Sequence, residues 1–212
     1  MRFSVWPNLM QPSDDVLAVA AHADRTGWDG VWVADHFMGD GGGFGPATSP
    51  TLESTAVLAA LAVATERVRL GPLVLGATYR HPAVVAKWAA TVDVLSGGRL
   101  VLGVGTGWQV NEHEQYGIDL PAVRDRVDRL DEACTVLTSL LRAERTTFEG
   151  RWFRLRDALC EPKPVQDRLP LLVGGKGDRK LGLVARHADE WNMWGMPELI
   201  AARSEGLDRH CD

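Results

Sequence analysis

Short apolar runs alternate along the chain with longer amphipathic stretches. Each short run is rich in Val, Leu or Trp and leads into glycine or polar residues, as buried strands do. The longer stretches repeat apolar positions at helical spacing, as Val16, Ala20 and Ala23 do. Strands that alternate with helices predict βα units around a parallel sheet. The predicted strands are residues 3–6, 30–34, 68–75, 100–104, 170–173 and 190–193.

Helix boundaries follow from capping residues. The first helix is predicted to begin near Ser13-Asp14-Asp15, where side-chain oxygens can cap free amides, and to end at Gly27. The pair Ser49-Pro50 predicts the start of the second helix, because proline at the first helical position loses no hydrogen bond. Further helices are predicted after His81-Pro82, over 123–141, up to His187 and from Pro197.

Six such βα units are too few for a closed barrel. A TIM (β/α)8 barrel has eight units and typically about 250 residues, whereas the chain has 212. Between residues 109 and 169 the alternation stops, and a long amphipathic helix precedes a predicted hairpin around 148–152. We therefore expect one α/β domain over residues 1–212. It is a TIM barrel truncated after about six units, with an insertion at about 109–169.

Composition and charge exclude several functions. With 45% hydrophobic and 24% charged residues, the chain has an ordinary globular composition. The net charge is −5, so no basic surface is expected for nucleic acid or an anionic membrane. The longest apolar run, residues 56–64, is shorter than the ~20 residues of a membrane span. The N-terminus has no secretory h-region, so we expect a cytoplasmic location.

The cysteines predict neither a disulfide nor a metal site. Cys134, Cys160 and Cys211 are odd in number, far apart and not in a CxxC motif.

Polar residues follow the predicted strands, and in a parallel sheet the carboxyl ends of the strands share the ligand-binding rim. His36 is the candidate for proton transfer, with Asp35 folding back to orient its ring; the alternative is a rim histidine bonded to the backbone. The glycine-rich segment 174–177 can form a nest for one phosphate or a tight strand-to-helix turn.

Other motifs favour structural roles. Arg80-His81 could bind a substrate anion, but capping of the following helix is the preferred interpretation. Glu112, His113 and Glu114 could form an acid/base or metal cluster. Adjacent helical residues point in different directions, which favours a solvated face. The glycines of 103–107 lack the dinucleotide spacing, and 174–177 lacks the P-loop spacing and its Ser/Thr.

The rim motifs together resemble the luciferase-like monooxygenase family, in its deazaflavin (coenzyme F420)-dependent oxidoreductase branch. The segments that carry the resemblance are 27–37, 79–82, 95–100, 103–108, 160–164 and 171–175. The resemblance implies a barrel of the bacterial luciferase type, with a flavin or deazaflavin across the carboxyl ends of the strands. It also implies a non-proline cis peptide at Leu73-Val74.

The resemblance assigns His36 as base or hydrogen-bond partner near the cofactor ring. The residues expected on the cofactor side are Asp35, Leu73, Val74, Thr106, Gly107, Asn111, Gly174, Gly175, Lys176 and Gly177. Some dehydrogenases of the family carry an acidic residue where this chain has Trp108, which argues against dehydrogenation of a sugar phosphate.

The function expected from the resemblance is hydride transfer between F420 and a small organic substrate, with His36 handling the proton. One alternative is an FMN-dependent monooxygenase supplied with reduced flavin by a separate flavin reductase. Another is a non-catalytic, incomplete barrel fragment. A homodimer is the expected assembly, and the sequence leaves the substrate open.

Overall fold

The computed structural model describes residues 2–211 and confirms the alternation of strands and helices. The strands are β1 (Ser4–Val5), β2 (Gly30–Val33), β3 (Arg69–Pro72), β4 (Leu75–Gly76), β5 (Leu102–Gly105), β6 (Thr146–Glu149), β7 (Arg154–Ala158), β8 (Leu171–Gly174) and β9 (Glu190–Asn192). The helices are α1 (Ser13–Thr26), α2 (Ser54–Ala64), α3 (Pro82–Ser96), α4 (Val110–Tyr116), α5 (Val123–Arg142), α6 (Asp178–His187) and α7 (Pro197–Cys211).

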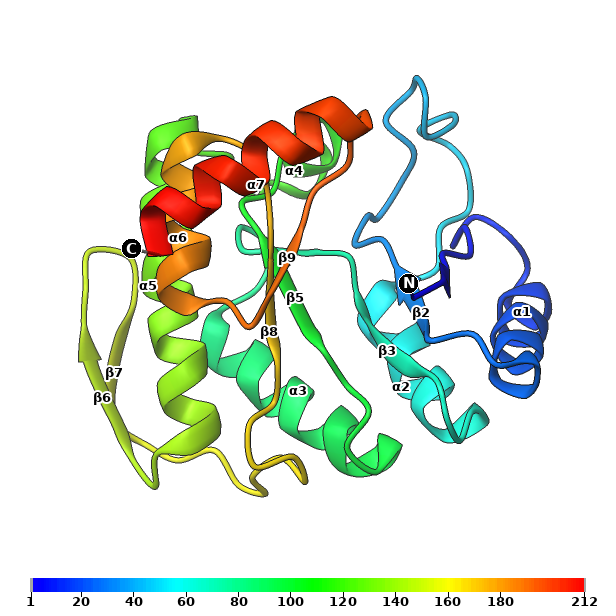
Figure 1. Cartoon of the computed structure of the whole chain (residues 1–212), viewed down its shortest axis with the longest axis horizontal. Helices are drawn as coiled ribbons and strands as arrows, with labels where there is room; N and C mark the ends of the chain where they lie inside the picture. The colour runs from blue at the N-terminus through cyan, green and yellow to red at the C-terminus, as the bar shows by residue number, and fades with distance from the viewer. Residues whose placement is uncertain (1, 212) are drawn as a thin grey trace.

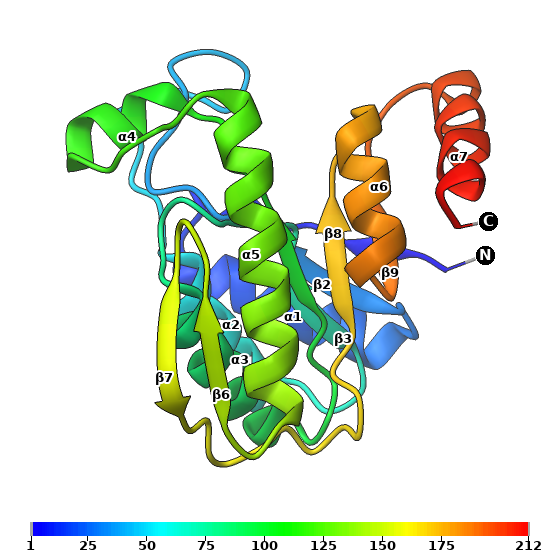
Figure 2. The ribbon, with the colours of Figure 1, turned by 90° about the vertical axis from the view of Figure 1, so that its left-hand side faces the viewer.

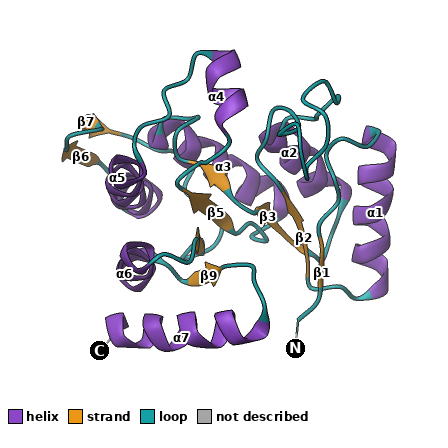
Figure 3. Cartoon of the chain, turned by 90° about the horizontal axis from the view of Figure 1, so that it is seen from above, coloured by secondary structure: helices purple, strands orange, loops and turns teal. Residues whose placement is uncertain are grey.

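The barrel wall is a curved row of parallel strands. One sheet has the order β1-β2-β3 and the other the order β4-β5-β8-β9, and every pair in both is parallel. A parallel bridge between Leu70 and Leu100 joins the two sheets. The helices lie outside the strands, as the view from above shows (Figure 3). The helices cover the outer face of the sheet, and nearly all residues of β2, β3, β5 and β8 are buried, which agrees with their apolar runs without alternation.

The third predicted strand is broken in two. It was expected to run without interruption over 68–75, but β3 ends at Pro72 and β4 begins at Leu75. The peptide bond between Leu73 and Val74 is cis, which confirms the expectation from the resemblance. The Val74 side chain fits against β5 and β8 only because Gly105 and Gly174 have no Cβ, which would lie 2.6 and 2.9 Å from Val74 Cγ2.

Replacement of Gly103 in β5 by alanine is expected to destabilise the barrel. The new Cβ would lie 2.1 Å from the Pro72 carbonyl oxygen, and a backbone atom cannot move away as a flexible side chain can. Overpacking of this kind costs about 1–3 kcal/mol. Urea unfolding measures the loss. Gly43→Ala is the matched control because nothing lies within 4 Å of its added Cβ. Equal stability of the two variants would contradict this view of the packing.

The segment that follows β5 leaves the βα repeat, as expected. It contains α4, the long helix α5 and the antiparallel hairpin β6–β7, which lies beside α5 in Figure 2. The apolar stripe predicted for 123–141 is buried from Val127 to Leu141, whereas Val123, its first member, is exposed. The long helix and the hairpin predicted from the sequence are therefore confirmed.

One predicted helix start and one predicted helix cap are wrong. The second helix begins at Ser54, after Glu53, whose carboxylate accepts a hydrogen bond from the Ala56 amide at 2.7 Å. Ser49-Pro50 lies in the preceding loop. The first helix does begin at Ser13, but Pro12 is its N-cap and no side chain caps it.

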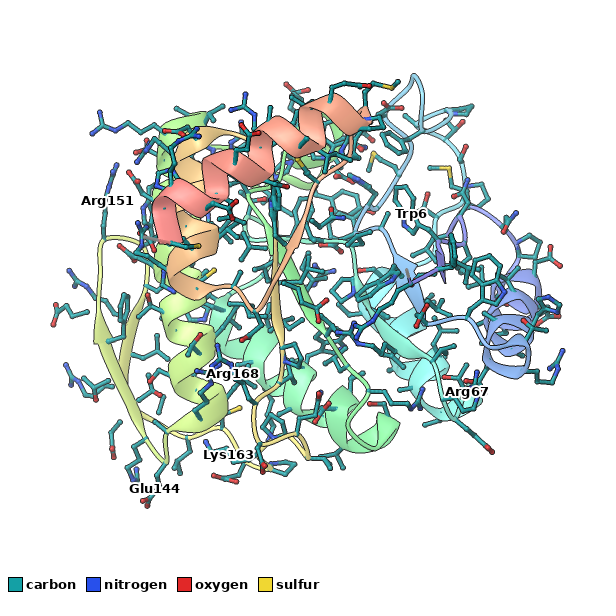
Figure 4. All side chains as sticks on the ribbon, in the orientation of Figure 1. Trp6, Arg67, Glu144, Arg151, Lys163 and Arg168 are labelled. Carbon is teal, nitrogen blue, oxygen red and sulfur yellow. The ribbon has the colours of Figure 1, made fainter. Side chains whose placement is uncertain are left out.

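Charged side chains such as Arg67, Glu144, Arg151, Lys163 and Arg168 lie at the periphery (Figure 4). Among residues 2–211, no helix has both the length and the apolar character needed to span a membrane.

Candidate active site

A buried carboxylate joins three segments at the carboxyl ends of the strands. Glu112, in α4, accepts a hydrogen bond from His36 Nδ1 at 2.9 Å and from the Phe37 amide at 2.8 Å. It also accepts one from the Tyr79 hydroxyl, beyond β4. In Figure 1, α4 and the loop after β2 both lie at the upper end of the strands. The fold therefore places His36 in a fixed orientation at the rim.

The charge of Glu112 decides the protonation pattern of His36. Burial acts to raise the pKa of Glu112, but the hydrogen bonds from His36, Tyr79 and Phe37 outweigh it and hold that pKa below its usual value. Burial and the neighbouring Glu112 raise the pKa of Tyr79, so its hydroxyl stays protonated and donates. Because an ionised carboxylate can only accept, His36 carries hydrogen on Nδ1. Its Nε2 is then free to take or give a proton.

Asp35 does not orient His36, which corrects the expectation from the sequence. Its carboxylate is buried and forms a bidentate ion pair with Arg80, at 2.8 and 3.0 Å. It also accepts hydrogen bonds from the Ser54 hydroxyl at 2.6 Å and the Gly76 amide at 2.9 Å. Arg80 is paired further with Glu53 at 2.5 Å. Asp35 therefore ties β2 to α2 and β4, and Glu112 takes the orienting role.

The solvated face expected for Glu112 and His113 is also wrong, because both side chains are buried. His113 bonds the Gln109 carbonyl oxygen through Nδ1 at 2.6 Å and the Thr78 hydroxyl through Nε2 at 2.8 Å. The sequence did carry a signal. Helix α4 has no apolar stripe to bury, so a helix packed on the rim must bury polar side chains.

The preferred interpretation of His81 is confirmed. Its Nδ1 accepts a hydrogen bond from the Ala83 amide at 3.1 Å and so caps α3. Arg80 does not take part in the cap, since both of its partners are carboxylates of Asp35 and Glu53.

Two aromatic side chains lie against His36. Trp108, in the loop between β5 and α4, meets the imidazole edge-on with ring centroids 5.4 Å apart. Phe44, from the loop after β2, has its centroid 5.9 Å from His36 and 5.9 Å from Trp108. The sequence indicated Trp108 both as a departure from the family and as a flat side chain near a strand end that could line a cofactor site, but it did not indicate Phe44. A lone Phe in a glycine-rich loop gives no periodic signal.

The residues expected beside the cofactor after β5 lie in the loop that follows the strand and in the first turn of α4. Thr106 is buried, and Gly107 has a φ of +72°, with Thr78 Oγ1 2.5 Å from where a Cβ would be. Asn111 donates to the Gly39 carbonyl oxygen at 2.8 Å, whereas its own buried Oδ1 has no partner among the described residues. That oxygen can accept a hydrogen bond from a ligand.

The segment 174–177 connects β8 to α6. The Gly175 amide donates to the Asn192 carbonyl at 2.9 Å, and the Gly175 carbonyl accepts from the Trp191 indole at 2.7 Å. Gly177 is the N-cap of α6 and provides no side-chain cap. Lys176 lies with its ammonium 5.2 Å from the centroid of the Trp194 ring. Helix-start amides are thus left at the rim, where they can bind an anion.

Three half-buried cations stand next to these loops. Arg126 donates to the Gly107 carbonyl at 2.6 Å, and Arg129 lies over the Phe153 ring. Lys180 packs against Gly175, with its Cδ 2.4 Å from the position that a Cβ of this glycine would occupy. Within residues 2–211, no carboxylate oxygen lies within 4.0 Å of a charged nitrogen of the three. Burial, and then the charge of Arg126, lower the pKa of Lys180. Unpaired, partly buried cations are costly and favour a bound anion.

Comparison with known proteins agrees with this geometry. The profile of the luciferase-like monooxygenase family matches residues 1–208. The chain belongs to the luciferase-like monooxygenase family. Its α/β architecture is therefore that of the family's TIM barrel.

Among relatives, the chain is 37% identical to an F420-dependent glucose-6-phosphate dehydrogenase of Microbacterium testaceum (strain StLB037), over 83% of this chain and 51% of that protein. It is 40% identical to a protein of the same name from Kineococcus radiotolerans, over 91% of this chain and 53% of that protein. The structure of an F420-dependent secondary alcohol dehydrogenase in complex with an F420-acetone adduct matches with a TM-score of 0.86 at 27% identity. The match covers 99% of this chain and 64% of that one. The chain thus spans about half the length of the curated relatives it matches.

In this luciferase-like protein, Glu112→Gln is expected to disturb His36 without unfolding the site. A neutral amide can still accept one hydrogen bond, but it no longer requires hydrogen on Nδ1. Nitrogen-15 NMR of the imidazole reports the tautomer, and we expect a mixture in place of the Nδ1–H form. Glu114→Gln, on the exposed side of α4, is the matched control. An unchanged His36 spectrum in Glu112→Gln would refute the orienting role.

Proposed function

We propose that this site belongs to an F420-dependent oxidoreductase that transfers a hydride to or from a small organic substrate. The observation that carries the proposal is the contact of His36 with the ionised Glu112 at 2.9 Å, at the end of a parallel barrel strand. Catalytic groups of such barrels lie at this end. The F420-dependent names of the relatives support the choice of cofactor.

His36 Nε2 is the proposed proton acceptor or donor at the substrate oxygen. Glu112 holds Nδ1–H, so the ring keeps one orientation and one tautomer, and the carboxylate stabilises the imidazolium when Nε2 is protonated. Tyr79 and the Phe37 amide hold Glu112 in place in turn. Bound F420 would supply the hydride acceptor or donor.

The residues present fit such a cofactor. Val74 packs against Gly105 and Gly174 at the carboxyl ends of β5 and β8, and the buried Asn111 Oδ1 has no donor among the described residues. The segment Gly174–Gly177 and the unpaired cations Arg126 and Lys180 suit a polyanionic tail. An FMN monooxygenase, served by a separate flavin reductase, would need only one phosphate there. The number of unpaired cations therefore favours F420.

Parallel titrations of the chain with oxidised F420 and with FMN test the proposal. Fluorescence quenching reports affinity, and selective binding to the folded chain must raise its melting temperature. We expect tighter binding of F420 than of FMN. Loss of one charge-assisted contact in Arg126→Gln should weaken F420 binding about tenfold. Arg124→Gln, exposed on the same helix, is the matched control. Preference for FMN would establish the monooxygenase alternative, and binding of neither cofactor would establish the non-catalytic one.

We also propose one barrel domain over residues 1–212, with the insertion at 109–169 and the last two βα units missing.

We further propose a homodimer formed through α2 and α3. Helix α2 carries no charged residue, so one apolar side remains after it covers the sheet. Val63 and Val84 are exposed there, beside a shallow apolar hollow at Trp88. Val63→Glu should shift the mass measured by light scattering from dimer to monomer.

A further inference from the structure

Two donors share one oxygen of the buried carboxylate at the rim. His36 Nδ1–H and the Tyr79 hydroxyl both donate to Glu112 Oε1. The Phe37 amide donates to the other oxygen, Oε2. The Glu112 side chain is 0% exposed, and hydrogen bonds at such a buried group are stronger than in water and influence one another. The strength of the His36–Glu112 hydrogen bond therefore depends on Tyr79.

The Tyr79 ring is fixed by contacts that do not involve its hydroxyl. Its centroid lies 4.8 Å from that of Phe37 and 4.6 Å from that of His113. A Cβ at Gly76 would lie 2.7 Å from Tyr79 Cε2, so the ring uses space that β4 leaves free by having glycine there. Loss of the hydroxyl alone should therefore leave the ring in place.

The Tyr79 hydroxyl remains a donor to an ionised carboxylate. Burial and then the hydrogen bond to Glu112 raise the pKa of Tyr79. Burial acts to raise the pKa of Glu112, but its three hydrogen bonds hold that pKa below the usual value. A hydrogen bond to the ionised form of a carboxyl stabilises that form and lowers its affinity for further protons. Each donor to Oε1 thus makes this oxygen a weaker acceptor for the other donor.

We propose that Tyr79 is a positioning residue that competes with His36 for Glu112 Oε1 and so limits how far the carboxylate stabilises the charged imidazolium. Glu112 then orients His36 through Nδ1–H, and a proton on Nε2 leaves more easily than it would without Tyr79. The use of this balance in the reaction rests on the proposed function, in which Nε2 takes up a proton and gives it back. The competition itself needs neither cofactor nor substrate.

The other charged groups near His36 keep their partners when Tyr79 changes. Asp40, whose carboxyl feels the charge of His36, accepts hydrogen bonds from two amides of its own loop. Asp35 and Arg80 act on Tyr79 through their charges, but they are paired with each other. A change at His36 in a Tyr79 variant therefore reports on Glu112.

Tyr79→Phe distinguishes competition from simple support, because the two roles predict opposite signs. If the hydroxyl only held Glu112 in place, its loss would weaken the His36–Glu112 hydrogen bond. Competition predicts a stronger bond, with the His36 Nδ1–H resonance further downfield in proton NMR. Exchange of this proton with solvent should become about two- to fivefold slower, because loss of a competing donor changes a charged hydrogen bond by a fraction of its strength.

Tyr116→Phe is the matched control. The Tyr116 ring stacks on Phe37 with centroids 5.1 Å apart and is 56% exposed. This substitution removes a hydroxyl from the same aromatic cluster, while the three donors to Glu112 found within residues 2–211 remain. The exchange rate of His36 Nδ1–H should not change.

A stronger donor at position 79 should have the opposite effect. Incorporation of 3-fluorotyrosine keeps the ring and the hydroxyl but makes the phenol more acidic, and its single fluorine can lie on the side away from Gly76. We expect the His36 Nδ1–H resonance to move upfield and its exchange to become faster. A purely structural role of the ring would leave both unchanged. This variant decides the question alone if Tyr79→Phe fails to fold.

Three results would each overturn the inference. They are an upfield or unchanged Nδ1–H resonance in Tyr79→Phe, a 3-fluorotyrosine variant without the opposite shift, and an equal effect of Tyr116→Phe. Because the measurements use the chain without F420, they are independent of the proposed function. Both expected shifts together with no binding of F420 would support the competition and refute only the cofactor. Binding of F420 without these shifts would refute only the role of Tyr79.

Discussion

His36→Ala is expected to lower kcat for F420 reduction by about 100-fold or more, because general acid–base catalysis by a positioned group contributes 10²- to 10⁴-fold. The proton of the substrate hydroxyl would have no acceptor in the ordered position now fixed by Glu112. The affinity for oxidised F420 should change little, since the proposed tail contacts lie at α5 and α6. Steady-state absorbance assays measure kcat, and quenching titration measures the affinity.

The control for this variant is a histidine with a structural role. His187, the last residue of α6, pairs with Asp131 of α5 at 2.6 Å, so His187→Ala removes an imidazole without touching the rim. Unchanged turnover in His36→Ala would remove His36 from the mechanism.

Asp35→Ala is expected to cause the largest loss of stability, about 3–5 kcal/mol, which is the usual cost of removing one partner from a buried ion pair. The Asp35 carboxylate is 1% exposed, and Arg80, at 17%, would be left largely buried with only Glu53 as a partner. The Ser54 hydroxyl and the Gly76 amide would lose their acceptor as well. Urea unfolding followed by circular dichroism measures the change in the free energy of unfolding.

A surface pair provides the comparison. Asp157 bonds Arg145 at 2.6 Å, but both side chains are exposed, and exposed pairs contribute about 0–1 kcal/mol. Arg145→Ala, which removes this pair, should therefore have a free energy of unfolding close to that of the unmutated protein. Similar losses in the two variants would show that Asp35 is not the junction of β2, α2 and β4 inferred from its contacts.

The order of the elements could be predicted from the sequence because each strand and each helix has its own pattern of apolar positions. The run 100–104 is apolar without alternation, and the stripe from Val127 to Leu141 repeats at helical spacing. These are local properties of the chain. The family resemblance likewise depends on residues that are close in sequence, and it located His36 and the Leu73-Val74 bond.

Predictions from local sequence motifs were wrong at two places. Ser49-Pro50 satisfies the rule for a helix start, yet the chain starts α2 at Ser54, where the Glu53 carboxylate caps the Ala56 amide. The prediction of a continuous strand over 68–75 was also wrong. Val74 packs against the glycines of β5 and β8, and these strands come later in the chain, so the local sequence does not show the contact.

The sequence by itself determined the strand-and-helix order, the rim at the strand ends and the candidate histidine. Only the tertiary structure decided which carboxylate serves that histidine. Asp35 is adjacent in sequence but is held by Arg80, whereas Glu112, 76 residues beyond His36, meets it because α4 lies against the loop that follows β2. A hydrogen bond depends on the positions of two atoms in space, and residues far apart in the sequence acquire such positions only when the strands pair.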